Sequence, residues 1–356
     1  MSVKTAGTRT AGATLQAIVP PRLWRDRSLL IGAIVVVVVF VAGPLGMNSY
    51  WLQASTVAIV YALIAGGAGL LVGRVGLYSL CQIALTAAGS WMALRLGFGT
   101  SLPFPVIILL SGAFSAVLGI IIGLPSLWVS GLALALLTLM GASAITLVLT
   151  VIHFPNGGDG ILGYSETGQG APALARPLIG ETTDGYFRYV LVVAAIVFLI
   201  VWLHLKSRPG RSWAAIRQSP ASAQAAGVNI TLYRVWAFLL ASFIAGVAGG
   251  LLAATGGIYI TQFPVQDSII LLAAVLMAGA YSLWGAVLAA LLMKFIGAAF
   301  SIWNVPPGLL LMLFGAGILQ SLLQSPTGIF GQLSTDLPKL WRRIRRGHRP
   351  AEEGRA

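Results

Sequence analysis

The sequence predicts an all-α, polytopic membrane helical bundle, and three observations support this class. Of the 356 residues, 58% are hydrophobic and only 9% are charged, whereas soluble domains carry about a quarter charged residues. The mean hydropathy is +0.91. Long apolar runs, such as 29–42, 188–205 and 233–255, carry charge only at their ends. Because a helix of about 20 apolar residues crosses the hydrocarbon core, a soluble enzyme is excluded.

Ten runs are apolar enough to be membrane spans, and eight or nine spans are alternatives because 267–323 is almost continuous. A basic tail (1–28) precedes this transmembrane domain (29–323), and a second basic tail (324–356) follows it. The ten predicted spans are 29–46, 52–72, 77–96, 103–123, 127–151, 188–205, 235–255, 267–281, 284–302 and 306–323.

The distribution of basic residues predicts the orientation, because short cytoplasmic loops are enriched in Lys and Arg. Arg22, Arg25 and Arg27 precede the first span, so we expect a cytoplasmic N-terminus and an uncleaved first span. With an even number of spans the C-terminus lies on the same side. The segment 206–234 then faces the cytoplasm and the loop 152–187 faces outward. All 22 Lys and Arg fall inside except Arg95, Arg176, Arg188 and Lys294.

Enzyme, metal and nucleic-acid signatures are missing from the sequence. It has no nucleotide-binding Gly-x-x-x-x-Gly-Lys-Ser/Thr loop and no Gly-x-Ser-x-Gly elbow. Its three histidines lack partners at zinc-ligand spacing, and the single Cys81 excludes an intrachain disulfide. The basic residues cluster at chain ends and connecting segments, which is typical of membrane orientation rather than of a nucleic-acid groove. We expect no catalytic residue and no metal site. A membrane-embedded transferase using His153 and Asp159 is a weak alternative.

Among ionisable residues, only Lys294 sits in the middle of an apolar run. Proton- and sodium-coupled transporters usually place carboxylates or histidines at membrane depth. This chain is therefore poorly equipped to couple transport to protons by itself, and we expect its energy to come from elsewhere. The alternative is a stand-alone secondary transporter or channel for a small polar solute. Snorkelling, or placement against the bundle interior, is the simpler interpretation of Lys294.

Small and polar residues recur at helical spacing inside the spans. Glycine pairs four residues apart, at 69/73, 119/123 and 246/250, predict close helix packing. A polar stripe lies on one predicted helical face, and a looser stripe lies on the fifth span. Each stripe is either interhelical glue or the wall of a substrate path. The first stripe comprises Ser79, Gln82, Thr86 and Ser90, and the second comprises Thr138, Thr146 and Thr150.

The cytoplasmic segment 206–234 is too long for a simple turn. Its Ala-rich middle, Trp213–Ala226, predicts a short helix that Pro220 interrupts and that Gly227 ends. Arginines flank an exposed surface of small residues. The pattern predicts a docking surface for a soluble partner, or a helix lying on the inner leaflet.

At this segment the sequence resembles the permease subunits of branched-chain amino acid ABC transporters. Residues 208–217 are similar to the family pattern R-x-G-R-x-x-x-A-I-R, and 223–229 are similar to A-x-x-x-G-I/V-N. The resemblance extends in order over about residues 50–330. It includes GLYSLCQIALTAAGSWMAL at 76–94, FPNGGDGILG at 154–163 and AGAYSLWGAVLAALL at 278–292.

This resemblance implies a multi-pass subunit of a bacterial-type inner (plasma) membrane. It implies two cytoplasmic ATPase subunits, a second related permease, an extracytoplasmic solute-binding protein and surrounding lipid as partners. ATP and Mg would be bound by the ATPases, with no cofactor in this chain. By the resemblance, Ala214–Gly227 couples to the ATPase and the Asn156 loop faces the binding protein. The coupling residues would be Ala215, Ile216, Arg217, Ala221, Ala225, Ala226 and Gly227, and the path residues Ser79, Gln82, Thr86, Thr138 and Asn156.

The chain departs from the family pattern at several positions. Cys81 replaces the glycine before Gln82, Pro220 enters the coupling stretch, and Ala286 replaces a proline. Neutral Gln218, Ser219 and Gln224 stand where acidic residues are usual. The substrate is therefore open among branched-chain or related amino acids, urea and short amides.

Overall fold

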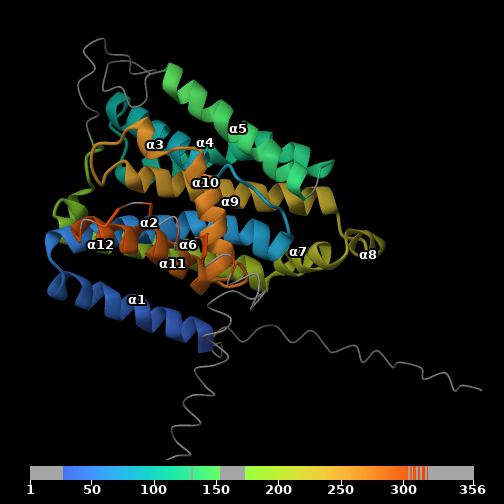
Figure 1. Ribbon diagram of the computed structural model, residues 1–356, viewed down its shortest axis with the longest axis horizontal. Helices are drawn as coiled ribbons and strands as arrows, with labels where there is room; N and C mark the ends of the chain where they lie inside the picture. Colours follow the sequence, from blue (N-terminus) through green and yellow to red (C-terminus); the bar gives the residue numbers. More distant parts are fainter. Residues whose placement is uncertain are drawn as a thin grey trace, which may run out of the picture.

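The computed structural model describes residues 27–129, 131–152 and 173–303, with scattered residues between 305 and 319. Every regular element in these ranges is a helix, as predicted (Figure 1). The elements are α1 Arg27–Gly46, α2 Ser49–Gly69, η2 Leu70–Val75, α3 Gln82–Gly99, α4 Phe104–Gly123, η3 Leu124–Leu127, α5 Leu132–Val151, η4 Leu178–Gly180, α6 Thr183–Lys206, α7 Arg208–Gln218, α8 Pro220–Ala225, α9 Ile230–Leu252, η5 Ile260–Gln262, α10 Gln266–Ala278, α11 Leu283–Ala290, η6 Leu291–Phe295 and α12 Ile296–Ile302.

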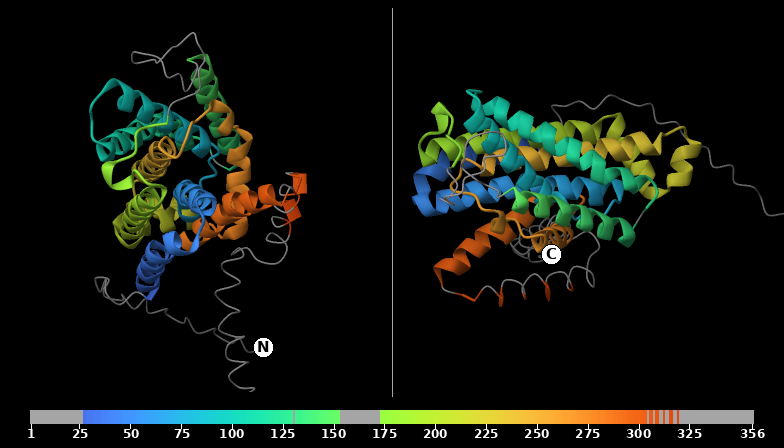
Figure 2. Two further views of the ribbon diagram at one scale, coloured as in Figure 1. Left: turned by 90° about the vertical axis from the view of Figure 1, so that its left-hand side faces the viewer. Right: turned by 90° about the horizontal axis from the view of Figure 1, so that it is seen from above.

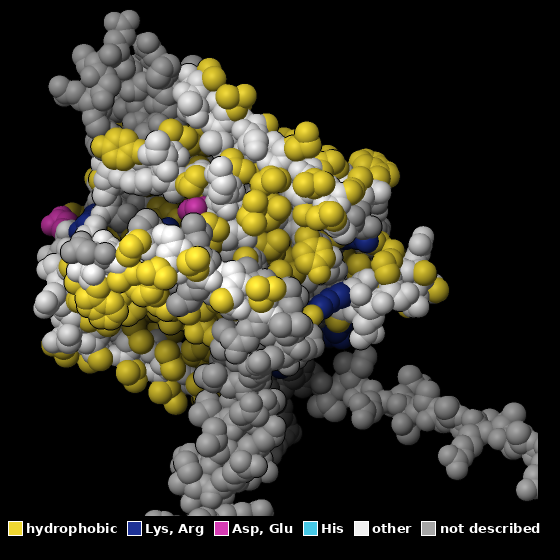
Figure 3. All heavy atoms as spheres, in the orientation of Figure 1, with side chains coloured by type: hydrophobic (Ala, Val, Ile, Leu, Met, Phe, Trp, Pro, Cys, Tyr) yellow, Lys and Arg dark blue, Asp and Glu magenta, His cyan; other side chains and the backbone are white. Residues whose placement is uncertain are grey.

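The long helices form a bundle, with α7 and α8 at one end of it (Figure 1). In the described ranges, seven helices are long and apolar enough to cross a membrane, and α1 adds a shorter apolar run from Leu30 to Gly46. Hydrophobic side chains cover much of the face shown in Figure 3, and the few charged side chains on it gather mostly towards its ends. The all-α membrane bundle is confirmed. The count of ten spans stays a prediction, because most of 306–323 lies outside the described residues, as do both tails and residues 153–172.

Helix α2 is the centre of the bundle. In the apolar stretch of Ser49–Val75, which joins α2 and η2, 89% of the residues are buried. Helices α6, α9, α10 and α11 all pack against α2. The end-on view shows α2 enclosed by other helices and α1 at the periphery (Figure 2). An apolar helix without a polar face is stable only when it is enclosed in this way or faces lipid all round.

Helices α3, α4 and α9 approach one another through glycine. A Cβ added to Gly89 would lie 2.6 Å from the Cα of Gly246, so the α3 and α9 backbones are in direct contact. The Ser90 hydroxyl donates to the Gly249 carbonyl at 2.8 Å, and the Ser115 hydroxyl of α4 donates to the Leu85 carbonyl of α3 at 3.0 Å. Small residues and hydroxyl bonds replace the hydrophobic effect as the attraction between helices in lipid.

The third predicted span begins later than expected. Residues 76–81 are not helical, and α3 starts at Gln82. Gly76 takes the left-handed φ of 80°, which ends η2. Other parts of the protein then satisfy two of the backbone amides of residues 76–81. The Leu77 amide donates to the Leu71 carbonyl and the Leu80 amide donates to Thr138 Oγ1, each at 3.0 Å. Irregular backbone is tolerated at membrane depth only when protein groups satisfy it in this way.

We predict that Gly89→Ala destabilises the bundle while Gly99→Ala on the same helix does not. The Gly89 methyl would collide with the backbone of Gly246, whereas a Cβ at Gly99 meets nothing within 4 Å. Overpacking of this kind costs about 1–3 kcal/mol. The midpoint of thermal unfolding in mild detergent measures the effect. Equal midpoints for the two variants would contradict the close α3–α9 contact.

Candidate coupling and translocation site

The segment 206–234 folds as two short helices with a break between them, as its sequence predicts. Ser219 is extended (φ −159°, ψ 110°), and its hydroxyl accepts a hydrogen bond from the Ser222 amide at 3.3 Å. Pro220 is the first residue of α8, where the missing amide proton is not needed. Gly227 has a left-handed φ of 80°, and the Val228 amide donates to the Ala223 carbonyl at 3.0 Å. The predicted C-cap at Gly227 is therefore confirmed.

Three apolar side chains attach this segment to the body of the protein. Trp213, Ile216 and Ala223 are each 2% exposed or less. The Trp213 indole donates its Nε1 proton to the Tyr233 carbonyl of α9 at 2.8 Å. A large buried ring with its polar atom satisfied holds a helix in one position. Consequently α7 is packed on the bundle rather than lying free at its end.

Arg217 links α7 to two other parts of the bundle. Its guanidinium donates to the Gly73 carbonyl of η2 and to the Tyr281 hydroxyl. The same guanidinium lies 4.3 Å from the centroid of the Tyr281 ring. Tyr281 belongs to the connection between α10 and α11. One side chain thus connects the segment 206–234, the end of the central helix and the α10–α11 connection.

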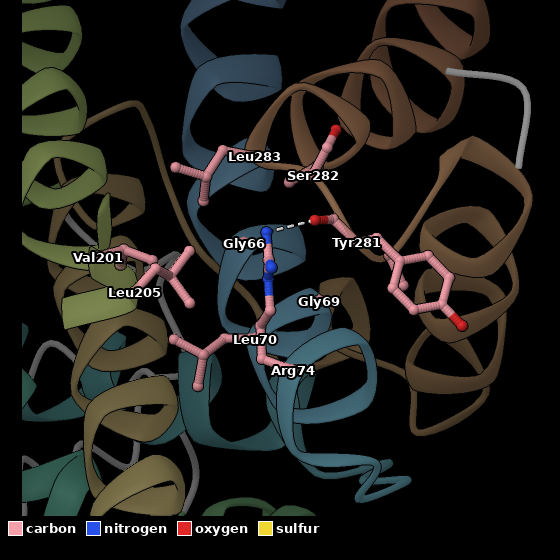
Figure 4. A pocket seen from close by; sticks show the side chains of 11 residues that line it. Gly66, Gly69, Leu70, Arg74, Val201, Leu205, Tyr281, Ser282 and Leu283 are labelled. Atoms are coloured by element: carbon pink, nitrogen blue, oxygen red, sulfur yellow. Dashed lines mark hydrogen bonds between the residues drawn. The ribbon is translucent and has the colours of Figure 1, made fainter. Parts of the chain in front are cut away.

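Arg74 of η2 reaches the same connection from the other side. Its Nη2 donates to the Tyr281 carbonyl at 2.5 Å, and Figure 4 shows this guanidinium pointing at the carbonyl while the Tyr281 ring points away. Leu70, Val201 and Leu205 help to line the narrow pocket around it. The two arginines therefore hold Tyr281 through different atoms.

The predicted coupling residues divide between two environments. Ile216 is buried against the body and Ala215 is half-buried. The remaining five residues are exposed, although the guanidinium of Arg217 reaches inward to Gly73 and Tyr281. They lie on α7, on α8 and in the turn after α8, and we call them the coupling face: Arg217, Ala221, Ala225, Ala226 and Gly227. Small side chains on this face leave room for a partner to approach the backbone closely.

The four predicted path residues that the structure describes are buried, but their hydroxyl groups are already engaged. Thr86 donates to the Gln82 carbonyl at 2.8 Å, and Thr138 accepts from Leu80 and donates to the Ala135 carbonyl at 3.0 Å. Ser79 precedes α3 and lies 3.1 Å (Oγ to Sγ) from Cys81, so its predicted place on the helical face is wrong. These contacts are those of structural polar groups.

Gln82 is the exception among the predicted path residues. Its side chain is 1% exposed, and both amide atoms lack a hydrogen-bond partner among the described residues. It lies close to Gly67 of α2, which itself approaches Ala241 of α9. A buried amide with unused donors and acceptors can form hydrogen bonds with a polar solute that passes it.

The predicted path residue Asn156 lies outside the described residues. On the looser stripe, Thr146 is half-buried and Thr150 is exposed, so that stripe is only partly interior.

A second polar region, which the sequence pattern does not reveal, lies at the opposite end of the bundle. A cavity of about 300 Å³ opens between α2, the α9–α10 connection and η6. Its polar lining consists of Gln53, Tyr61, Thr255, Gln262 and Lys294. The sequence singled out Lys294 because it interrupts an apolar run. Gln53, Thr255 and Gln262 lie at span ends or in a connection, where polar residues are ordinary.

Comparison with known proteins supports one family. The family model described as "Branched-chain amino acid transport system / permease component" matches residues 50–322. The high-affinity branched-chain amino acid transport system permease protein LivM of Salmonella typhimurium is 27% identical over 72% of this chain. The protein of the same name from Escherichia coli is 26% identical over 73% of this chain. The galactose/methyl galactoside import permease protein MglC of Haemophilus influenzae is 27% identical over 42% of this chain and 43% of its own length.

The matched regions cover 65% and 66% of the two LivM proteins, so the chain spans just under two thirds of these relatives. No solved structure matches the chain. The family match extends from the start of α2 to beyond α12 and includes the coupling face, the segment before α3 and the cavity of about 300 Å³. This multi-pass membrane protein therefore belongs to the family of branched-chain amino acid transport system permease components.

Proposed function

We propose that this chain is the membrane-spanning subunit of an ATP-driven importer for branched-chain or related amino acids. The observation that carries the proposal is the coupling face, which Arg217 joins to the end of the central helix and Trp213 joins to α9. The sequence contains no nucleotide-binding loop of its own. Two cytoplasmic ATPases would supply the energy, a second related permease would complete the pathway, and an extracytoplasmic binding protein would deliver the substrate. The orientation follows the distribution of basic residues, with both termini in the cytoplasm.

The coupling would work by displacement of rigid elements. An ATPase that moves on ATP binding would push α7 and α8, whose buried anchors prevent the helices from sliding freely. Arg217 would pass the displacement to Gly73 and Tyr281, and thus to α2 and to the α10–α11 connection. Because α2 contacts most of the other long helices, a small shift of this helix would change the packing along the whole bundle.

Co-purification is the first test of this proposal. Tagged chain would be extracted from its native host in mild detergent, and the proteins that accompany it would be identified by mass spectrometry. We expect an ATPase with a P-loop and a second hydrophobic permease. A chain that purifies alone and still moves solute in liposomes would contradict the importer and favour a stand-alone secondary transporter. Competition of labelled leucine uptake by valine, urea, acetamide and galactose would then assign the substrate.

We predict that Ala225→Glu abolishes leucine uptake and that Ala225→Ser preserves it. Residue 225 is exposed on the coupling face, where a bulky charged side chain would hold the partner away without disturbing the buried core. Uptake into cells and the amount of protein in the membrane fraction measure the two effects separately. Normal uptake by the glutamate variant would remove the coupling face from the mechanism.

We predict that Arg217→Lys reduces uptake at least several-fold although its charge is retained. A lysine presents a single ammonium and cannot reproduce the planar fork that bonds Gly73 and Tyr281 together. The matched control is Arg211→Lys, which changes an exposed arginine on the same helix. Uptake at saturating leucine, normalised to membrane protein, measures the effect. Equal loss in both variants would argue against a specific role for Arg217.

A further inference from the structure

The cavity of about 300 Å³ between α2, the α9–α10 connection and η6, which we call the outer cavity, lies at the end of the bundle away from the coupling face. Helix α9 begins next to α8 and runs across the bundle, so its C-terminal connection, residues 253–265, lies at the far end. That connection forms one wall, and the N-terminal half of α2 forms another. By the predicted orientation this end faces the outside. The volume of about 300 Å³ is at the lower limit of pockets that hold small molecules.

Lys294 places a positive charge in this cavity. It lies in η6, a π-helical turn in the last described span, and turns of this kind occur frequently at functional sites. Its Nζ is 4.0 Å from the centroid of the buried Tyr61 ring of α2. Among the described residues, no carboxylate oxygen lies within 4.0 Å of the Lys294 nitrogen, the limit for an ion pair. Asp267 of α10 attracts the ammonium from a greater distance. The ammonium thus has an aromatic face on one side and no directly bonded anion.

The remaining lining has two chemical characters. Neutral polar groups come from Gln53, Thr255 and Gln262. Each donates one hydrogen bond to a backbone carbonyl, and their side-chain oxygens can still accept hydrogen bonds from a solute. Val57, Ile258 and other apolar side chains form the rest of the wall. A single cation, several neutral hydrogen-bonding groups and an apolar wall suit a small solute with a carboxylate, further polar atoms and an aliphatic side chain. A sugar offers no anion that would offset the cost of keeping the lysine ammonium away from bulk water.

We propose that the cavity lined by Tyr61, Thr255 and Lys294 is a binding site for an α-amino acid with an apolar side chain, and that Lys294 binds its carboxylate. This inference rests on the proposed import function and names the substrate class that the permease itself recognises. The carboxylate completes the coordination of the ammonium with charge-assisted hydrogen bonds. Tyr61 holds the ammonium in place before the substrate arrives.

Substituted-cysteine labelling tests the site without requiring transport. The single native cysteine, Cys81, is 0% exposed, so wild-type protein should react slowly with a membrane-impermeant maleimide. Thr255→Cys places a reactive thiol in the cavity. We expect L-leucine to slow its labelling and L-leucinamide, which has no carboxylate, to protect far less. Adding Lys294→Met should raise the half-protecting concentration of leucine about tenfold or more. Lys294→Arg should restore protection, because arginine also binds carboxylates.

A matched control removes a different cation, Arg188 in the first part of α6. Arg188 also lies over an aromatic ring, with its guanidinium carbon 5.5 Å from the Phe40 centroid, but it does not line the cavity. Arg188→Met should leave the protection by leucine unchanged. Equal protection by leucine and leucinamide, or full protection in the Lys294→Met background, would overturn the carboxylate site.

Uptake measured on the same variants separates this inference from the proposed function. Loss of leucine uptake in Lys294→Met with normal uptake in Arg188→Met supports the site. Normal uptake in Lys294→Met overturns the site and leaves the importer standing. Protection by leucine in a wild-type complex that imports no amino acid would refute the proposed function while supporting the site.

Discussion

The contact between α3 and α9 is the constraint on which the rest of this bundle depends. Lipid offers no hydrophobic effect between helices, so association requires close backbone approach and internal hydrogen bonds. Gly89, Gly246 and Gly249 allow that approach, and Ser90 and Ser115 bond across the contacts that result. With α3, α4 and α9 held as one unit, α2 is enclosed between this unit and α6, α10 and α11. The position of α2 then determines where both functional ends lie.

The two ends of the central helix carry different chemistry. At its C-terminal end, η2 presents the Gly73 carbonyl to Arg217 and the Arg74 guanidinium to Tyr281. Further towards its N-terminus, Val57 and Tyr61 contribute to the cavity of about 300 Å³. Wide π-helical turns occur at both places, in η2 and in η6. In the proposed import cycle, this rigid, enclosed helix would connect an ATPase docked at one end to a substrate bound at the other.

The polar residues at 79, 82, 86 and 90, in and just before α3, show how membrane proteins divide polar residues between structure and function. Three members bond backbone carbonyls or neighbouring side chains, as expected where an unsatisfied group is costly. Gln82 has no such partner among the described residues and so differs from its neighbours in environment rather than in sequence context. Spacing alone cannot distinguish the two roles, because glue and path residues both face the bundle interior.

The sequence by itself determined the membrane class and the helical periodicity. It also determined that Pro220 interrupts the helical segment 206–234 and that Gly227 ends its second helix. These features depend on apolar length and on local backbone preference, which are properties of short stretches. Only the tertiary structure decided that Trp213 and Ile216 face inward, that α3 starts at Gln82, and that Gln53 lies beside Thr255. The last two residues are 202 positions apart and are joined by a hydrogen bond of 3.4 Å. Which distant segments meet depends on how complete helices pack, and no local pattern contains that information.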